Sequence, residues 1–413
     1  MFASYIPETG TLHSAIQAEP LWRAAFDLGY PAAVWRMPHA QELNLLISIQ
    51  DGIRQQIADL ENLPACFVIH PFESPSSGES YILEGDVLIT FSEDMQLLRL
   101  TNRLGEEQPA VQQLFDRAKQ LSAQDEVKPV VWNGLSRRSE TDPASRAHYT
   151  QAVEKAVEEI RAGNFMKLVL SRTKPGHYSK DFRPFQAFLR LCSAYASAFV
   201  SLVNLPDRGE QWMGATPETL VSVSADGIFK TTSLAGTQSI KNAEGDLIPP
   251  KKVLWGQKEI EEQALVSRYI IECFKKIRLR EYLETGPKTI RAGNLYHLRT
   301  DFEVQMKEVN FAELGTVMLK LLHPTSAVCG MPRESARTFI KNIEGFDRSF
   351  YSGFLGPVQM AGESALFVNL RCVRLSEGTA TFFAGAGITE DSDPMREWEE
   401  TEMKCETLLS VLT

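Results

Sequence analysis

Paired cysteines, long apolar runs and an excess of positive charge are all missing from this sequence of 413 residues. Its six cysteines are scattered without a Cys-x-x-Cys pair, which predicts free thiols in a reducing compartment. No apolar stretch reaches the roughly 18 residues of a membrane-spanning helix, and the N-terminus lacks the basic and apolar segments of a signal peptide. We therefore expect a cytoplasmic protein that has no membrane partner.

The charge balance limits the partners further. With 43 basic and 53 acidic residues, the chain carries a net charge of −10 at neutral pH. A surface of this kind repels nucleic acids and anionic membranes, so we expect neither to bind. It would also repel a small anionic substrate, which would then need a metal ion or locally placed cations. The sequence is compatible with either a monomer or a homodimer.

Several common catalytic motifs are absent as well. The sequence has no G-x-G-x-x-G fingerprint, no G-K-S/T phosphate loop, no G-x-S-x-G and no H-E-x-x-H. The GAG segment at 385–387 matches none of these motifs. His297 and His323 stand alone, and isolated histidines are more often core residues than catalysts. The motifs therefore give no support for nucleotide-phosphate, α/β-hydrolase or zinc-protease chemistry.

The patterning predicts an α+β fold with many antiparallel strands and helices outside them. Apolar runs predict strands at 66–72, 81–91, 165–172, 219–232 and 379–388. The second run contains a Gly-Asp turn, the fourth is a hairpin around Asp226-Gly227, and the last ends in a glycine turn. Helical spacing predicts helices at 149–160, at 251–276 and from Pro394 onward, the last with Asp393 as its cap. The polar stretch 122–146 predicts a connector and a boundary near residue 140.

The segment 391–404, DSDPMREWEETEMK, has six acids among fourteen residues. Such a run usually marks a solvated helix face. Here Glu397, Glu400 and Lys404 are spaced i, i+3 and i+7, so they share one face that continues toward the apolar tail. Two of the acids can therefore point inward together.

A second inward acid is predicted on the helix at 251–276. Glu262 shares a face with Val266 and Tyr269, and an acid on an apolar face is costly unless it is paired or bound to a cation. Together with the acids near the C-terminus it could hold Mg²⁺, which favours oxygen ligands. The alternative is simple pairing of Glu262 with Lys258, four residues earlier.

Nine stretches together resemble the chorismate-utilising enzymes, and among them the isochorismate synthases. They follow the family's order over about 145–413: KLVLSR (167–172), GATPE (214–218), LAGT (234–237), KEIEEQ (258–263), YHLRT (296–300), LHPTSAVCGMP (322–332), FDRSFYSGFLG (346–356), NLR (369–371) and GAGITEDSDPMREWEETEMK (385–404). The resemblance implies a large sandwich of two antiparallel sheets with helices outside, similar to anthranilate synthase component I. Residues 1–140 would be a weakly recognised N-terminal part and 145–413 the chorismate-binding catalytic region, with both parts in one structural domain.

The resemblance also implies roles for individual residues. Glu262, Glu397 and Glu400 would form the Mg²⁺ shell, Lys167 would be the general base and Glu218 the general acid. The remaining positions would bind the substrate: Gly236, Thr237, His297, Ala327, Arg371, Gly385 and Lys404. Lys167 can act as a base only if its pKa falls from about 10.4, and Glu218 as an acid only if its pKa rises from about 4.3.

Two residues bear on the reaction. Relatives that also eliminate pyruvate tend to carry Thr where this chain has Ala327, so Lys167 with Ala327 favours water addition that stops at isochorismate. A salicylate synthase is the runner-up. Gln263 replaces the family's usual His beside the metal-binding Glu, which motivates a third reading, a chorismate-binding module without activity. The sequence leaves open whether the product feeds menaquinone or siderophore biosynthesis.

Overall fold

The computed structural model of the chain describes all residues except 1–16, 74–77, 128–131, 137–141, 243 and 293–294. The described residues contain two antiparallel β-sheets and eight α-helices. None of these helices is both long and apolar enough to cross a lipid bilayer. All six cysteines are free thiols, as the sequence predicted.

Ten strands form sheet A and nine form sheet B in the described part of the chain. From edge to edge, sheet A consists of β15 (Gly330–Met331), β8 (Lys167–His177), β19 (Thr379–Ile388), β18 (Cys372–Ser376), β10 (Glu210–Thr216), β9 (Phe199–Leu205), β1 (Ala32–Arg36), β2 (Leu43–Ile47), β6 (Val87–Phe91) and β7 (Leu97–Asn102). Sheet B consists of β13 (Leu283–Ala292), β14 (Leu295–Gln305), β12 (Ile228–Ser239), β11 (Thr219–Val223), β17 (Ser364–Val368), β16 (Phe354–Val358), β4 (Cys66–His70), β5 (Ser80–Glu84) and β3 (Ile53–Gln56).

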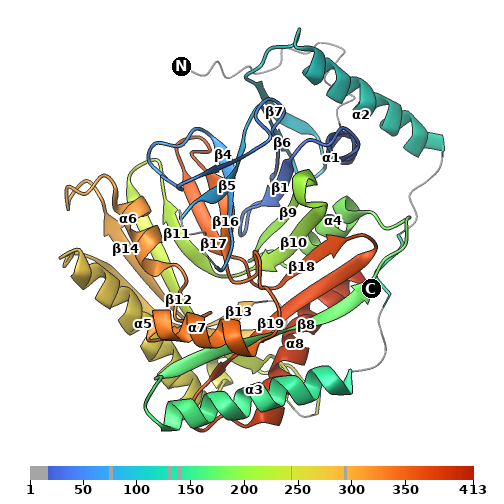
Figure 1. Ribbon diagram of the computed structural model, residues 1–413. Coiled ribbons are helices and arrows are strands. Elements are labelled where there is room, and N and C mark those ends of the chain that lie inside the picture. Colours follow the sequence, from blue (N-terminus) through green and yellow to red (C-terminus); the bar gives the residue numbers. More distant parts are fainter. Residues whose placement is uncertain (1–16, 74–77, 128–131, 137–141, 243, 293–294) are drawn as a thin grey trace.

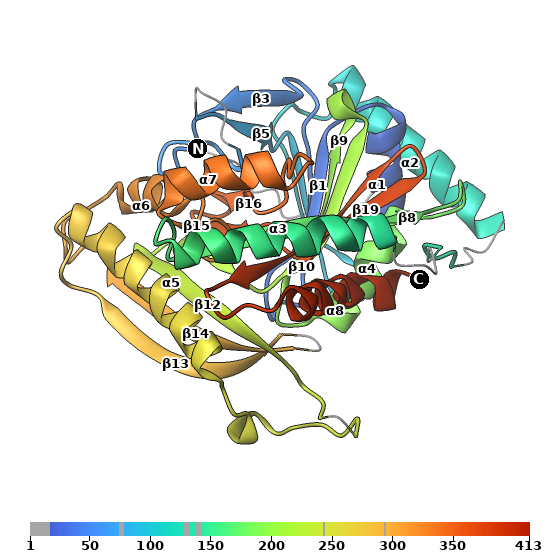
Figure 2. The same ribbon diagram turned by 60° about the horizontal axis from the view of Figure 1, so that its bottom comes forward.

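The helices lie around the outside of the two sheets (Figures 1 and 2). They are α1 (Ala18–Asp27), α2 (Pro109–Val127), α3 (Pro143–Arg161), α4 (Pro184–Ala194), α5 (Gln257–Lys276), α6 (Leu314–Leu322), α7 (Arg333–Ile343) and α8 (Pro394–Leu412), with 3₁₀ turns at Pro206–Arg208 and Pro250–Lys252. Helices α1, α2, α4 and α8 share an apolar core with sheet A. Helices α5 and α6 share another with sheet B. The architecture is the α+β sandwich that the sequence predicted.

Strand periodicity decides which side chains lie between the sheets. In β1, Ala33 and Trp35 belong to the core between the sheets, whereas Val34 belongs to the core under the helices of sheet A. Trp35 meets Phe67 of sheet B at 5.3 Å between ring centroids. Alternate residues of one strand thus serve two different cores, as the two-residue period requires.

Both sheets mix strands from before and after residue 140. In sheet A, β1 pairs with β9, and in sheet B, β4 pairs with β16. The long pair of β8 with β19 extends from Leu168 opposite Ile388 to His177 opposite Thr379. It places the segment that begins at Lys167 beside the glycines of 385–387.

Several predicted elements are confirmed. The hairpin at 219–232 is formed by β11 and β12, with Ser222 opposite Lys230. The strand at 379–388 is β19, and the last helix begins at Pro394. Its cap is Asp393, whose side chain accepts a hydrogen bond from the backbone N–H of Arg396 at 2.9 Å. These features depend on residues close in sequence, which the sequence pattern reports directly.

Three details were wrong. The Gly-Asp turn at 85–86 does not join a hairpin, because β5 belongs to sheet B and β6 to sheet A, so the chain crosses between the sheets there. The glycines at 385–387 lie within β19 and not after it. The connector is shorter than 122–146, since α2 continues to Val127 and α3 begins at Pro143, and much of what separates them lies outside the described residues.

A buried ion pair fixes the segments on either side of β8. Arg348 donates to Glu344 at 2.8 Å, to the carbonyl of Val169 at 2.8 Å and to that of Val328 at 2.8 Å. Glu344 in turn accepts the backbone N–H of Ser171 at 2.7 Å. Arg348 and Glu344 are 3% and 7% exposed. The pair therefore holds β8 at a fixed distance from the segment around Val328.

We predict that Arg348→Met lowers the free energy of unfolding by about 3–5 kcal/mol, because it leaves the Glu344 carboxylate buried without its partner. The control is Arg374→Met, which removes a partly exposed pair with Glu210 at 3.5 Å and should cost less than about 1 kcal/mol. Chemical denaturation measures both. Equal losses in the two variants would contradict a special role for the buried pair.

Candidate active site

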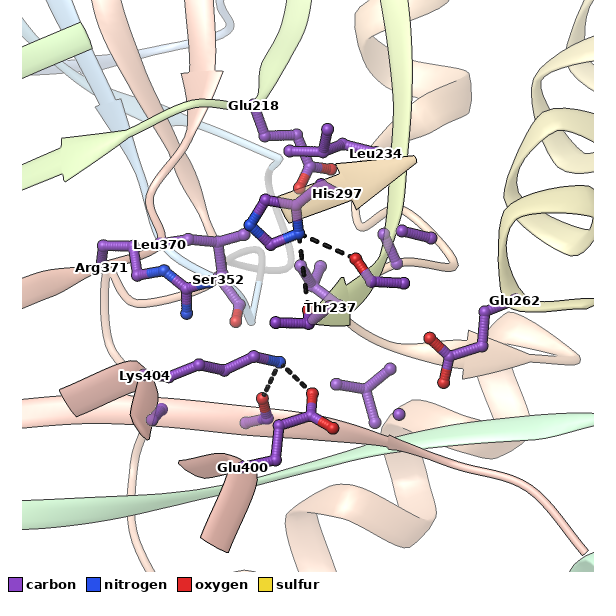
Figure 3. A pocket seen from close by; sticks show the side chains of 18 of the residues that line it. Glu218, Leu234, Thr237, Glu262, His297, Ser352, Leu370, Arg371, Glu400 and Lys404 are labelled. Carbon is purple, nitrogen blue, oxygen red and sulfur yellow. Dashed lines mark hydrogen bonds and ion pairs between the residues drawn. The ribbon is translucent and has the colours of Figure 1, made fainter. Parts of the chain in front are cut away.

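One pocket is lined by segments from both sheets and two helices. Sheet A contributes β8 and β19, sheet B contributes β12 and β14, and α5 and α8 contribute acidic side chains. The cavity among these groups has a volume of about 90 Å³. Figure 3 shows Arg371 on one side of the pocket and Glu262 on the other, with Lys404 and Glu400 between them.

The predicted base and acid both face this pocket and are both buried. Lys167, at the start of β8, is 2% exposed, and Glu218, just after β10, is 4% exposed. Among the described residues, the amino group of Lys167 has no hydrogen-bond or ion-pair partner. Burial raises the pKa of the Glu218 carboxyl to about 8, although Lys167, Arg371 and Lys404 act to lower it. Glu218 is therefore mostly protonated at neutral pH.

Two further cations line the pocket. Lys404 of α8 donates to the carbonyl of Gly385 at 2.8 Å and pairs with Glu400 at 2.7 Å. The guanidinium of Arg371 forms no hydrogen bond or ion pair within the described ranges, and burial lowers its pKa. Its backbone φ is 44°, in the left-handed region that residues other than glycine rarely adopt. Arg371 is thus a cation held toward the pocket without an anion of its own.

His297 of β14 is a neutral acceptor in this pocket. Its Nδ1 lies 2.8 Å from the carbonyl of Gly236 and 3.5 Å from the hydroxyl of Thr237. Because a carbonyl can only accept, Nδ1 carries the proton and Nε2 has the free lone pair. Burial lowers the pKa of His297 to about 3, so the ring stays neutral. Nε2 is buried with no partner among the described residues.

The three predicted metal-binding acids surround a lysine. Glu397 is 2% exposed and pairs with Lys258 of α5 at 2.5 Å, so Lys258 pairs with Glu397 and not with Glu262 as the alternative reading supposed. Burial lowers the pKa of this ammonium, but the carboxylates of Glu397, Glu400 and Glu262 outweigh that effect and raise it. The acidic segment at 391–404 is therefore more than a solvated face.

The donor set suits a hard divalent cation. All three side chains offer carboxylate oxygens, which Mg²⁺ prefers, and Oε2 of Glu397 is buried without a hydrogen-bond partner in the part of the chain that is described. A cation already lies there in the form of the Lys258 ammonium. No three acidic, histidine or cysteine side chains of the described residues are yet close enough together to enclose an ion. The chemistry of these side chains therefore suits a magnesium ion, which would have to take the place of the lysine.

Glycines bring these groups close to the backbone of β19. A Cβ on Gly387 would lie 2.6 Å from Oε1 of Glu262 and 3.0 Å from Cε of Lys167. A Cβ on Gly385 would lie 2.5 Å from the Ser171 hydroxyl. A side chain at either position would displace these groups, so glycine suits both places of GAG although no nucleotide motif exists here.

Gln263 supports α5 from the buried side. Its side-chain amide donates to the hydroxyl of Thr300 at 2.9 Å and to the carbonyl of Ser233 at 3.4 Å. These contacts tie the helix turn that carries Glu262 to β12 and β14. An amide at this position therefore still fixes the neighbouring acid.

The structure brings nearly all the predicted site residues together. Those that line the pocket are Lys167, Glu218, Gly236, Thr237, Glu262, His297, Ala327, Arg371, Gly385, Glu400 and Lys404. Glu397 lies behind them, paired with Lys258. Sequence reasoning missed Tyr351, which lines the pocket, and the pairing of Lys258 with Glu397. The segment around Tyr351 was among the nine matching stretches and could have pointed to it.

Comparisons with known proteins agree with this picture. The sequence profile described as "Chorismate binding enzyme" matches residues 76–413. The chain belongs to this family.

Individual relatives carry names of one activity. The chain is 32% identical over 200 residues to isochorismate synthase EntC of Escherichia coli (strain K12), covering 48% of this chain and 50% of that protein. It is 32% identical over 274 residues to the salicylate biosynthesis isochorismate synthase of Pseudomonas aeruginosa, covering 65% and 55%. These matches thus span about half the length of the relatives.

A solved structure shares the fold. That of MenF, the menaquinone-specific isochorismate synthase from Escherichia coli, superposes with a TM-score of 0.72 at 22% identity, covering 98% of this chain and 92% of that one. The sandwich with its outer helices is therefore the fold of the family.

The raised pKa of Glu218 predicts a stability effect that depends on pH. The unfolded chain loses this proton near pH 4.5 and the folded protein near 8, so the contribution to stability is complete below about 4.5 and is lost as the pH rises to about 8. Glu218→Gln cannot ionise. Relative to the wild type, its free energy of unfolding should therefore rise by about 3 kcal/mol between pH 5 and pH 8. Denaturation series at both pH values check this, and a constant difference would refute it.

Proposed function

We propose that the protein is an isochorismate synthase, an isomerase that converts chorismate reversibly to isochorismate. Water adds at C2 of the ring while the C4 hydroxyl leaves. The observation that carries the proposal is that buried Lys167 and buried, protonated Glu218 line the same pocket. The family membership and the names of the relatives support it.

The charges of the pocket suit a substrate with two carboxylates. Arg371 offers a guanidinium without an anion of its own, and a bidentate contact with a carboxylate would use its planar fork. Lys404 adds a second positive charge, partly offset by Glu400. The net charge of −10 makes such local cations necessary, because the protein as a whole repels the substrate.

Proton transfer is divided between the acid and the base. Lys167 accepts a proton from water as the water oxygen bonds to C2. The ring double bonds shift, and the bond from C4 to its hydroxyl oxygen breaks. Glu218 gives its proton to that oxygen, which leaves as water. His297 lies beside the ring, where its Nε2 accepts a hydrogen bond from a substrate hydroxyl.

Glu262, Glu397 and Glu400 would hold Mg²⁺, directly or through water. When bound, the ion would supply positive charge for a carboxylate on the substrate ring. Gly236 and Thr237 would help to orient the substrate with backbone groups, and so would Gly385. These three positions line the pocket.

Two observations weigh against the alternatives. Ala327 lines the pocket and offers no hydroxyl, which favours a reaction that stops at isochorismate over a salicylate synthase. Gln263 keeps its hydrogen bonds to Thr300 and Ser233, which weakens the case for an inactive module.

Product analysis tests the proposal. Purified protein with chorismate and Mg²⁺ should form isochorismate, resolved by chromatography. Lys167→Met and Glu218→Gln should each lower kcat by at least about 10²-fold, because each removes a proton-transfer group. The control Lys174→Met, on the same strand but paired with Glu402, should stay within about twofold of the wild type, as a partly exposed ion pair contributes little.

Three other outcomes would each replace the proposal. Release of pyruvate would identify a salicylate synthase. Tight chorismate binding without turnover would identify a binding module. Full activity in Lys167→Met would remove the base assignment.

The pKa of Glu218 also predicts an alkaline limit. As the pH rises through about 8, the acid loses its proton, so kcat/KM for chorismate should fall about tenfold per pH unit above that value. The measurement is a pH–rate profile at saturating Mg²⁺, and the residual rate of Glu218→Gln should lack this limb. A wild-type profile that stays flat to pH 10 would show that Glu218 does not act as the acid.

A further inference from the structure

Lys258 lies beside a carboxylate that the proposed function assigns to a metal ion. Nζ of Lys258, in the first turn of α5, lies 2.5 Å from Oε1 of Glu397 in α8. Glu262 comes one turn later on α5 and faces the pocket. The ammonium is therefore a cation placed between acids that come from two helices remote in sequence.

Each acid of α8 in this cluster has its own lysine. Glu397 pairs with Lys258, and Glu400 pairs with Lys404 at 2.7 Å. Glu262 forms no hydrogen bond or ion pair with any residue that the structure describes. The two lysines thus neutralise two of the three carboxylates. Among the described residues, no three ligands lie close enough together to hold an ion.

The pairing satisfies Glu397 only in part. One carboxylate oxygen accepts from Lys258, while Oε2 is buried with no hydrogen-bond partner in the described ranges. A buried acceptor left unpaired costs about 1–3 kcal/mol. A divalent ion brings twice the charge of an ammonium and can bind both oxygens of one carboxylate, so it can take over this role.

We propose that Lys258 is the built-in counter-ion of this carboxylate cluster and that it competes with the divalent metal ion for Glu397. The inference rests on the proposed function, since it assumes that Mg²⁺ binds here. Metal binding then requires Lys258 to release Glu397. The affinity of the free enzyme for the ion is therefore set by the difference between the free energies with which the metal ion and the Lys258 ammonium bind this carboxylate.

The position of Lys258 allows that release. Its side chain is 31% exposed, whereas that of Glu397 is 2% exposed. The ammonium can turn toward solvent along its flexible stem without crossing the apolar core, as lysine side chains at surfaces commonly do. Lys258 is thus a positioning residue for the metal-free state and takes no part in the chemical step.

Calorimetric titration with Mg²⁺, in the absence of substrate, tests the proposal on intact protein. Lys258→Met should bind Mg²⁺ about tenfold more tightly than the wild type, which corresponds to about 1.4 kcal/mol. Lys258→Arg keeps the charge and should stay within about twofold. The matched control is Lys230→Met, which removes a lysine paired with Glu303 far from the pocket and should leave the Mg²⁺ affinity unchanged.

Thermal unfolding gives a second readout that does not depend on activity. Without metal, Lys258→Met should melt at a lower temperature than the wild type, because Glu397 loses the ammonium with which it pairs. At saturating Mg²⁺ the difference should disappear, since binding stabilises the folded state. Lys258→Gln, which keeps a hydrogen bond to Glu397, is the second variant if the methionine variant folds poorly.

The outcomes separate this inference from the proposed function. Unchanged or weaker Mg²⁺ binding in folded Lys258→Met or Lys258→Gln would overturn the competition while leaving the metal site in place. If neither the wild type nor these variants bind Mg²⁺, the metal assignment falls and the competition with it. Isochorismate formation is tested separately, by product analysis.

Discussion

Charges of both signs compensate one another in and beside the pocket. Glu397 is almost fully buried beside Lys258, and Glu400 is held by Lys404. Each of these charges would be costly alone, because burial disfavours ionised groups. The same rule keeps Glu218 protonated, since its desolvation outweighs the effect of Lys167, Arg371 and Lys404. The acid, the base and the proposed metal ligands are therefore one electrostatic system, and a change in one alters the others.

The fold was predictable where short-range chemistry decides it. Asp226-Gly227 fixes a two-residue hairpin and Asp393 caps α8, and both act within a few residues of themselves. The pair Gly85-Asp86 looks the same in the sequence but joins strands of different sheets. The difference is that β5 pairs with β4 in sheet B, whereas β6 pairs with β2 in sheet A. Such pairings between distant segments leave no local trace in the sequence.

The candidate site was likewise predictable where the contacts are local in sequence. Helical spacing predicted that Glu397, Glu400 and Lys404 share a face, and the resemblance to known enzymes supplied the remaining positions. The pairing of Lys258 with Glu397 was not predicted, because it depends on how α5 lies relative to α8. Spacing on α5 alone favoured Glu262 as the partner. Contacts within a helix can be derived from its sequence, whereas contacts between helices need the packing that sets their distance.

Because β8 pairs with β19, sheet A cannot be completed until the C-terminal part of the chain has been synthesised. Lys167 leaves the ribosome long before Gly385 and Lys404, yet all three line one pocket. Until the later segment is synthesised, one side of β8 has unpaired backbone groups, a state that favours association with other chains. Strand pairs so remote in sequence also form slowly. The nascent chain is therefore expected to need protection by a chaperone until its last strand and helix emerge.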